Sequence, residues 1–79
     1  MDLTIRLERI EQEIRQVENQ KLQREQTLGA FWEHMPAIDP NIIRDRMLSL
    51  RNEIRVLENR KRALLKEQQE LIVRAVTPS

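Results

Sequence analysis

The stretch LGAFWEHMPAIDPN, from Leu28 to Asn41, decides how this chain folds. It holds both aromatic residues, the only glycine, the only histidine and two of the three prolines. Pro36 disfavours helical geometry in the residue before it. Asp39 and Pro40 form a favourable helix start, since aspartate is a good N-cap and proline suits the first helical position. The stretch therefore predicts a turn between two helices.

The predicted elements account for the whole chain of 79 residues, which is short enough to form a single domain. Asp2 is a favourable N-cap for the first helix. At 1.5 Å per residue each arm is roughly 45 to 55 Å long. The expected bounds are a helix over about 2–35, a turn over 36–39, a helix over 40–76 and a short tail over 77–79.

Apolar residues on both sides of the turn follow a heptad repeat, in which positions a and d form a seam. Before the turn, a positions fall at residue 7 and every seventh residue to 35, and d positions at residue 3 and every seventh to 31. After it, d positions start at Ile43 and a positions at Met47. The predicted core comprises Leu7, Ile10, Ile14, Val17, Leu28, Phe31, Met47, Leu50, Ile54, Leu57, Leu64 and Leu71.

Two arrangements of these heptads compete. Leucines at every d position from 50 to 71 resemble a zipper that pairs in parallel with a second chain. That pairing would set Arg46 against Arg51 and Glu53 against Glu58, which are like charges. A short turn instead makes antiparallel neighbours the default. The sequence thus favours an all-α fold, an antiparallel two-helix coiled-coil hairpin.

One register aligns the two arms throughout. If seam partners have numbers that sum to 78, each polar seam residue faces an aliphatic one, on which its methylenes can lie. These polar residues are Lys21, Arg24, Lys61 and Gln68. The same register places Arg6 beside Glu67 and Glu13 beside Arg60, with complementary charges.

The polar centre of the seam leaves a hairpin with little buried apolar surface, so we expect further association. Trp32 flanks the seam, where it either covers the end of the hairpin's own core or anchors a partner. A homodimer forming a four-helix bundle is favoured, with a helical protein partner as the alternative. The candidate interface residues are Trp32, Leu48, Leu65 and Ile72.

A basic row on the second helix supports nucleic-acid binding as the alternative function. Its residues follow steps of seven and four, which keeps them on one outer side: Arg44, Arg51, Arg55, Arg62 and Lys66. Interspersed glutamates dilute this charge, and no aromatic residues lie between the arginines for base stacking.

Composition argues against other classes. With 39% hydrophobic and 34% charged residues, the chain suits long helices better than a compact core. It has no cysteine and one histidine, His34, so we expect no enzyme activity, metal, cofactor or small-molecule substrate. No apolar run is long enough for a membrane span, and we expect a soluble, cytoplasmic protein. The predicted function is a coiled-coil interaction module, such as a small scaffold, adaptor, assembly subunit or regulator.

Overall fold

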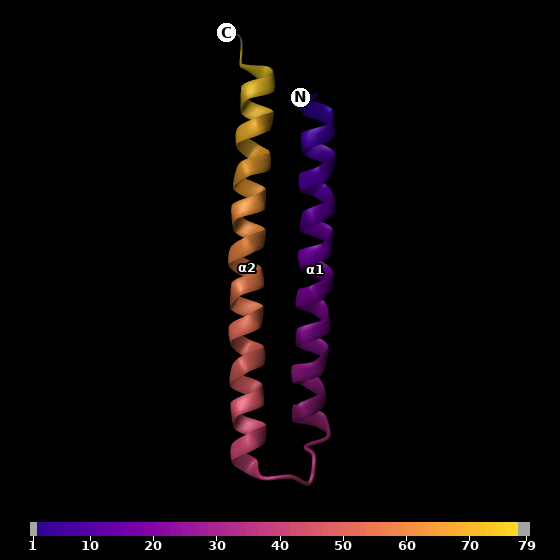
Figure 1. Ribbon diagram of the computed structural model, residues 1–79, viewed down its shortest axis with the longest axis vertical. Coiled ribbons are helices and arrows are strands. Elements are labelled where there is room, and N and C mark those ends of the chain that lie inside the picture. The colour runs from indigo at the N-terminus through magenta and orange to yellow at the C-terminus, as the bar shows by residue number, and fades with distance from the viewer. Residues whose placement is uncertain (1, 78–79) are drawn as a thin grey trace.

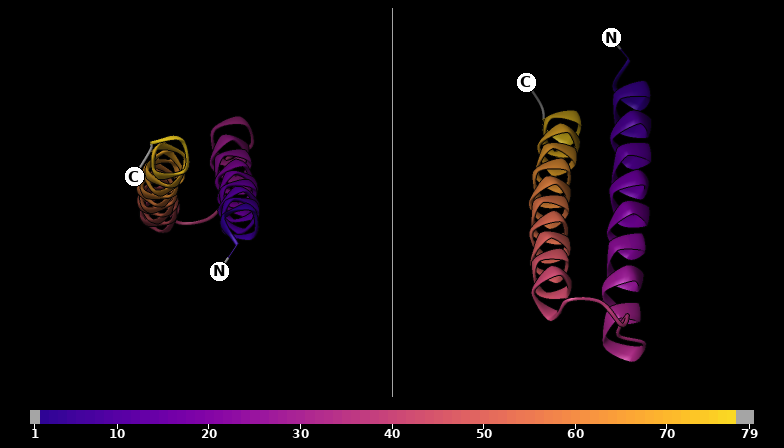
Figure 2. Two further views of the ribbon diagram at one scale, coloured as in Figure 1. Left: turned by 90° about the horizontal axis from the view of Figure 1, so that it is seen from above. Right: turned by 60° about the horizontal axis from the view of Figure 1, so that its bottom comes forward.

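The computed structural model describes residues 2–77 and consists, over that range, of two helices joined by one turn. Helix α1 runs from Leu3 to Glu33 and helix α2 from Pro40 to Val76. They lie side by side and antiparallel, in a body of 62 × 18 × 15 Å (Figures 1 and 2). The expected all-α two-helix hairpin is confirmed.

Both helices begin at an aspartate cap. The Asp2 carboxylate accepts a hydrogen bond from the backbone N–H of Thr4 at 3.1 Å. The Asp39 carboxylate accepts one from the N–H of Asn41 at 2.9 Å, and Pro40 follows it at the first helical position. Each cap satisfies a backbone donor that the first turn leaves without a helical partner.

The first helix ends two residues earlier than predicted, and this changes the environment of Met35. His34 is the C-cap, and its backbone N–H bonds to the carbonyl of Ala30 at 2.9 Å. The residue before Pro36 is driven out of helical geometry, so Met35 leaves the seam and is 58% exposed. Ala75, also assigned to the seam, is exposed at the other end. Both seam assignments are wrong: Pro36 removes Met35 from α1, and Ala75 is level with the first residue of α1, where no further turn of that helix covers it.

The remaining seam positions all turn inward. Among the described residues, seven side chains are buried: Ile10, Ile14, Val17, Ile43, Leu50, Leu64 and Leu71. The other apolar seam residues are half-buried: Leu3, Leu7, Leu28, Phe31, Met47, Ile54 and Leu57. The main cluster lies at the end of the hairpin away from the turn, where Ile14 and Leu64 pack together with their neighbours. The four polar seam residues are half-buried as well.

Ion pairs between the helices follow the predicted register. Arg60 donates to Glu13 at 3.0 Å, a predicted pair. Between residues 2 and 77, Arg6 and Glu67 form no ion pair within 4.0 Å. Three seam cations extend to carboxylates on the opposite helix: Lys21 to Glu58 at 3.4 Å, Arg24 to Glu53 at 3.7 Å and Lys61 to Glu18 at 3.0 Å.

Gly29 is a helix-interior glycine that the hairpin does not require. Its φ is negative, and a Cβ added to it would meet no atom within 4 Å. We therefore expect Gly29→Ala to raise the free energy of unfolding by about 0.5 to 1 kcal/mol, since glycine is that much poorer than alanine in a helix. Thermal unfolding followed by circular dichroism measures this. A lower melting temperature would show that this site cannot accept a methyl group.

Neither helix, over residues 2–77, contains a stretch both long enough and apolar enough to cross a bilayer.

Candidate interaction surface

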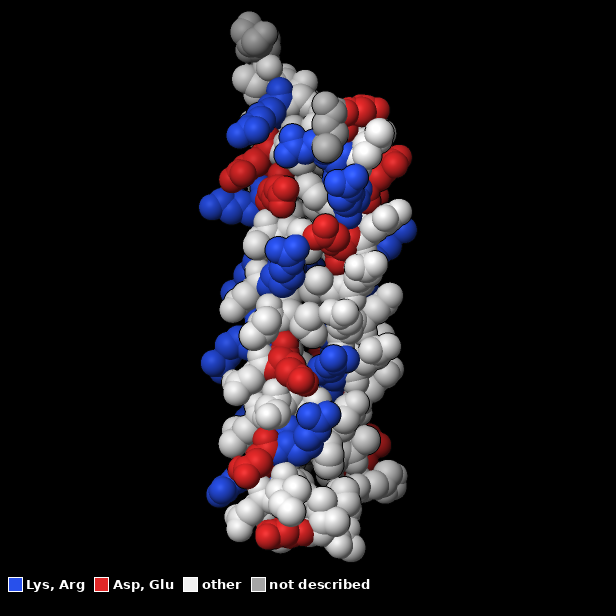
Figure 3. Space-filling view, in the orientation of Figure 1, with Lys and Arg blue, Asp and Glu red and all other residues white. Residues whose placement is uncertain are grey.

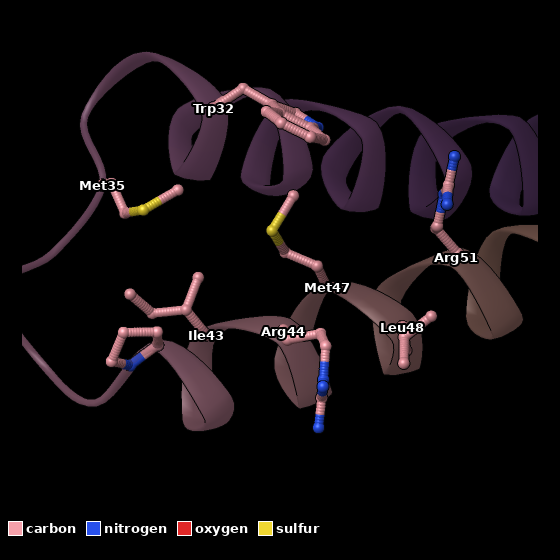
Figure 4. Close-up of a pocket in the computed structure, with 8 residues that line it drawn as sticks. Trp32, Met35, Ile43, Arg44, Met47, Leu48 and Arg51 are labelled. Atoms are coloured by element: carbon pink, nitrogen blue, oxygen red, sulfur yellow. The ribbon is translucent and has the colours of Figure 1, made fainter.

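A groove opens beside the turn, where the end of α1 meets the start of α2. Its volume is about 290 Å³. Ile43 and Met47 point from α2 toward α1, and Trp32 lies above them on α1 (Figure 4). The groove is lined by Trp32, Met35, Pro40, Ile43, Arg44, Met47, Leu48 and Arg51.

Trp32 lies at the rim of this groove and not beneath its surface. Its side chain is 69% exposed, because position e of the last turn of α1 flanks the seam instead of entering it. Contact with the hairpin's own core therefore buries only part of the indole. The rest of a large amphipathic ring remains available for contact.

A second hollow continues this surface along α2. Its lining includes Leu28, Arg55 and Glu58, and it shares Leu48 and Arg51 with the groove. Both hollows lie on the side of the hairpin formed by positions e and b of the two helices, which we call the Trp32 face. In an antiparallel pair the e positions of both helices flank the same side of the seam.

The other two candidate interface residues extend the same face. Leu65 and Ile72 follow Glu58 at steps of seven, so they also occupy e positions of α2. Both are exposed, as is Leu48. The groove thus brings together two of the predicted interface residues, Trp32 and Leu48, and the heptad positions of Leu65 and Ile72 put them on the same side of the hairpin.

Four of the five candidate nucleic-acid residues share that side. Arg44 and Arg51 line the groove together with Trp32, and Arg55 lines the second hollow. Arg62 follows Arg55 by seven residues and so also lies at a b position. Lys66, at an f position, points away from the face. Two surfaces that the sequence suggested separately are therefore largely one surface, which combines apolar and basic side chains.

Figure 3 shows the hairpin from one side, where acidic and basic side chains are intermixed along α2. Across residues 2–77 no three His, Asp or Glu side chains gather closely enough to hold a metal ion. His34 occupies the C-cap of α1, where its backbone closes the helix.

Met35 lines the groove, although the heptad repeat predicts it in the seam. The signal was available, because the conformational restriction imposed by Pro36 acts on Met35 itself. Ile38 and Ile42, both exposed near the turn, were also not singled out.

The comparisons with known proteins give no match: none of the protein-family models fits this chain, and neither a curated protein nor a solved structure is measurably similar to it.

Proposed function

We propose that this chain is a coiled-coil interaction module that associates with itself through the Trp32 face to form a four-helix bundle. The observation that carries the proposal is the row of exposed apolar side chains along that face, which ends in a tryptophan at the rim of an apolar groove. Tryptophan is among the residues that most often supply binding energy at protein interfaces.

The small core of the hairpin supports the same proposal. The centre of its seam contains Lys21, Arg24 and Lys61, each half-buried and ion-paired near the surface. Such pairs contribute only about 0 to 1 kcal/mol each. Covering the Trp32 face with further helices would add the buried apolar area that this seam lacks.

Sedimentation equilibrium over a range of concentrations tests self-association. The expected result is a molar mass that rises from that of the 9.5 kDa chain to twice that value. A stable monomer at every concentration would exclude the homodimer and leave the alternative of a different helical partner.

Nucleic-acid binding is the second candidate. It is favoured by Arg51, Arg55 and Arg62, which have no carboxylate within 4.0 Å among residues 2–77. Binding of generic RNA or duplex DNA should then weaken steeply with salt, because each phosphate contact releases a counterion. The absence of binding at low salt would remove this candidate. Since the arginines lie on the Trp32 face, dimerisation and nucleic-acid binding should compete.

A further inference from the structure

The Trp32 face has its acidic side chains on one helix and its basic side chains on the other. Positions e and b of α1 carry four glutamates and one arginine, a net charge of −3: Glu8, Glu11, Arg15, Glu18 and Glu25. The same positions of α2 carry four arginines and one glutamate, a net charge of +3: Arg44, Arg51, Arg55, Glu58 and Arg62. This separation makes the face complementary to a second copy of itself.

The hairpin does not use this complementarity internally. Glu18 on α1 pairs with the seam residue Lys61 at 3.0 Å, and Glu58 on α2 pairs with the seam residue Lys21 at 3.4 Å. Glu25, Arg51 and Arg55 take part in no ion pair within 4.0 Å in the described part of the chain. They remain available to a partner of opposite charge.

Two twofold-symmetric arrangements would set one Trp32 face on another with antiparallel neighbours. If the twofold axis runs along the helices, both turns lie at the same end and α1 packs on α2 of the second copy. If the axis is perpendicular to the helices, the turns lie at opposite ends and each helix packs on its own counterpart. The charge distribution and the apolar residues each distinguish these arrangements.

The charges favour the axis along the helices. A rotation about this axis leaves each residue at the same height along the bundle. A residue of α1 is therefore level with the residue of the second copy's α2 whose number brings the sum to 78, as within one hairpin. Glu25 is then level with the gap between Arg51 and Arg55 of the second copy, because seam partners sum to 78. The perpendicular axis would instead set the α1 row, with its net charge of −3, against an identical row, and the α2 row of net charge +3 against itself, so that Arg55 of one copy lies near Arg62 of the other. Juxtaposed like charges cost association free energy.

The apolar residues favour the same axis independently. When levels are kept, Trp32 on α1 packs against Leu48 on α2 of the second copy, because residues 32 and 46 are level. With a perpendicular axis and full overlap, Trp32 would lie level with Glu8, and Leu65 with Arg51. Burying Trp32 against Leu48 is more favourable than placing it beside the carboxylate of Glu8.

We propose that a second copy of this chain docks on the Trp32 face with its turn at the same end, so that Glu25 of each copy lies between Arg51 and Arg55 of the other. This inference rests on the self-association proposed above. It also states what covers Arg51 and Arg55 in the dimer, namely Glu25 on α1 of the second copy.

A spin label at the turn distinguishes the two arrangements. The chain has no cysteine, so Ala37→Cys gives a unique attachment site in the exposed turn. Helices in contact lie about 8 to 10 Å apart, so labels at the same end should be separated by roughly 20 to 40 Å, linkers included. Turns at opposite ends would be separated by about the 62 Å length of the body. The long distance would overturn the orientation and leave self-association intact, whereas no coupling between labels would overturn both.

Charge inversion gives a second test. Glu25→Arg alone, or Arg51→Glu with Arg55→Glu, should each weaken dimerisation about tenfold, since like charges then meet twice in the dimer. Combining all three substitutions should restore the affinity. Arg46→Glu is the matched control, because Arg46 occupies a g position of α2 on the other side of the seam. A triple variant no tighter than the weaker of the two parents would overturn the proposed contact.

Discussion

Replacing Leu64 by alanine is expected to lower the free energy of unfolding of the hairpin by about 3 kcal/mol. Leu64 is 2% exposed and belongs to the cluster that contains Ile14 and Leu71. Removing a buried leucine side chain loses its transfer free energy and leaves a cavity, and such changes typically cost about 2 to 5 kcal/mol. Urea unfolding followed by far-UV circular dichroism measures the loss.

The neighbouring leucine is the matched control for this experiment. Leu65 is 42% exposed, so Leu65→Ala removes the same atoms from a surface position. Its effect on the hairpin should stay below about 1 kcal/mol. Both variants are compared at a concentration low enough that association does not add to stability. Equal losses at the two positions would contradict the observed seam.

Leu64→Ala can leave too little folded protein to measure, because a domain of this size is only marginally stable. Ile14→Val provides a milder change within the same cluster. It removes one methylene from a buried side chain, and we expect a loss of about 0.5 to 1.5 kcal/mol. No loss in this variant would show that the cluster is not tightly packed.

Replacing Trp32 by alanine is expected to weaken self-association by about 30-fold or more. A tryptophan that acts as a hot spot in an interface commonly contributes about 2 kcal/mol or more to binding, and 1.4 kcal/mol corresponds to a factor of ten. The unfolding free energy of the isolated hairpin should change little, because the indole is mostly exposed. Sedimentation equilibrium of the variant and the wild-type chain measures the difference.

Val56 provides the control for this substitution. It is as exposed as Trp32 but occupies a c position of α2, on the opposite side of the seam. Val56→Ala should leave association unchanged. A comparable weakening by both variants would show that the dimer contact is not confined to the Trp32 face. An unchanged affinity after Trp32→Ala would remove the tryptophan from the interface altogether.

Local chemistry in the sequence was sufficient to predict the two helices. The start of α2 follows from Asp39 and Pro40, because a side-chain acceptor and a preset φ favour the first turn whatever packs around it. The seam follows from heptad spacing, since residues three and four apart share one side of a helix. Both are short-range effects, and a single sequence contains them.

Ion-pair partners could not be predicted in the same way. The pair between Glu13 and Arg60 was predicted, whereas that between Arg6 and Glu67 was predicted and does not form. Long side chains choose among several neighbours on two helices, and Lys61 extends to Glu18 because their positions are nearly level across the seam. The free-energy differences between such choices are small, so no sequence rule decides them.

The sequence by itself determined that the chain forms two amphipathic helices with a turn at Pro36 to Asp39, because caps, proline restrictions and heptads act within a few residues. Only the tertiary structure decided that the end of α1 and the start of α2 form a groove, with the exposed Met35 in its lining and Trp32 at its rim. It also decided which side chains line that groove and which carboxylates the seam cations reach. Periodicity and register place a residue on one side of the hairpin, but whether neighbouring side chains fill a space or leave a groove depends on how the two helices pack against each other.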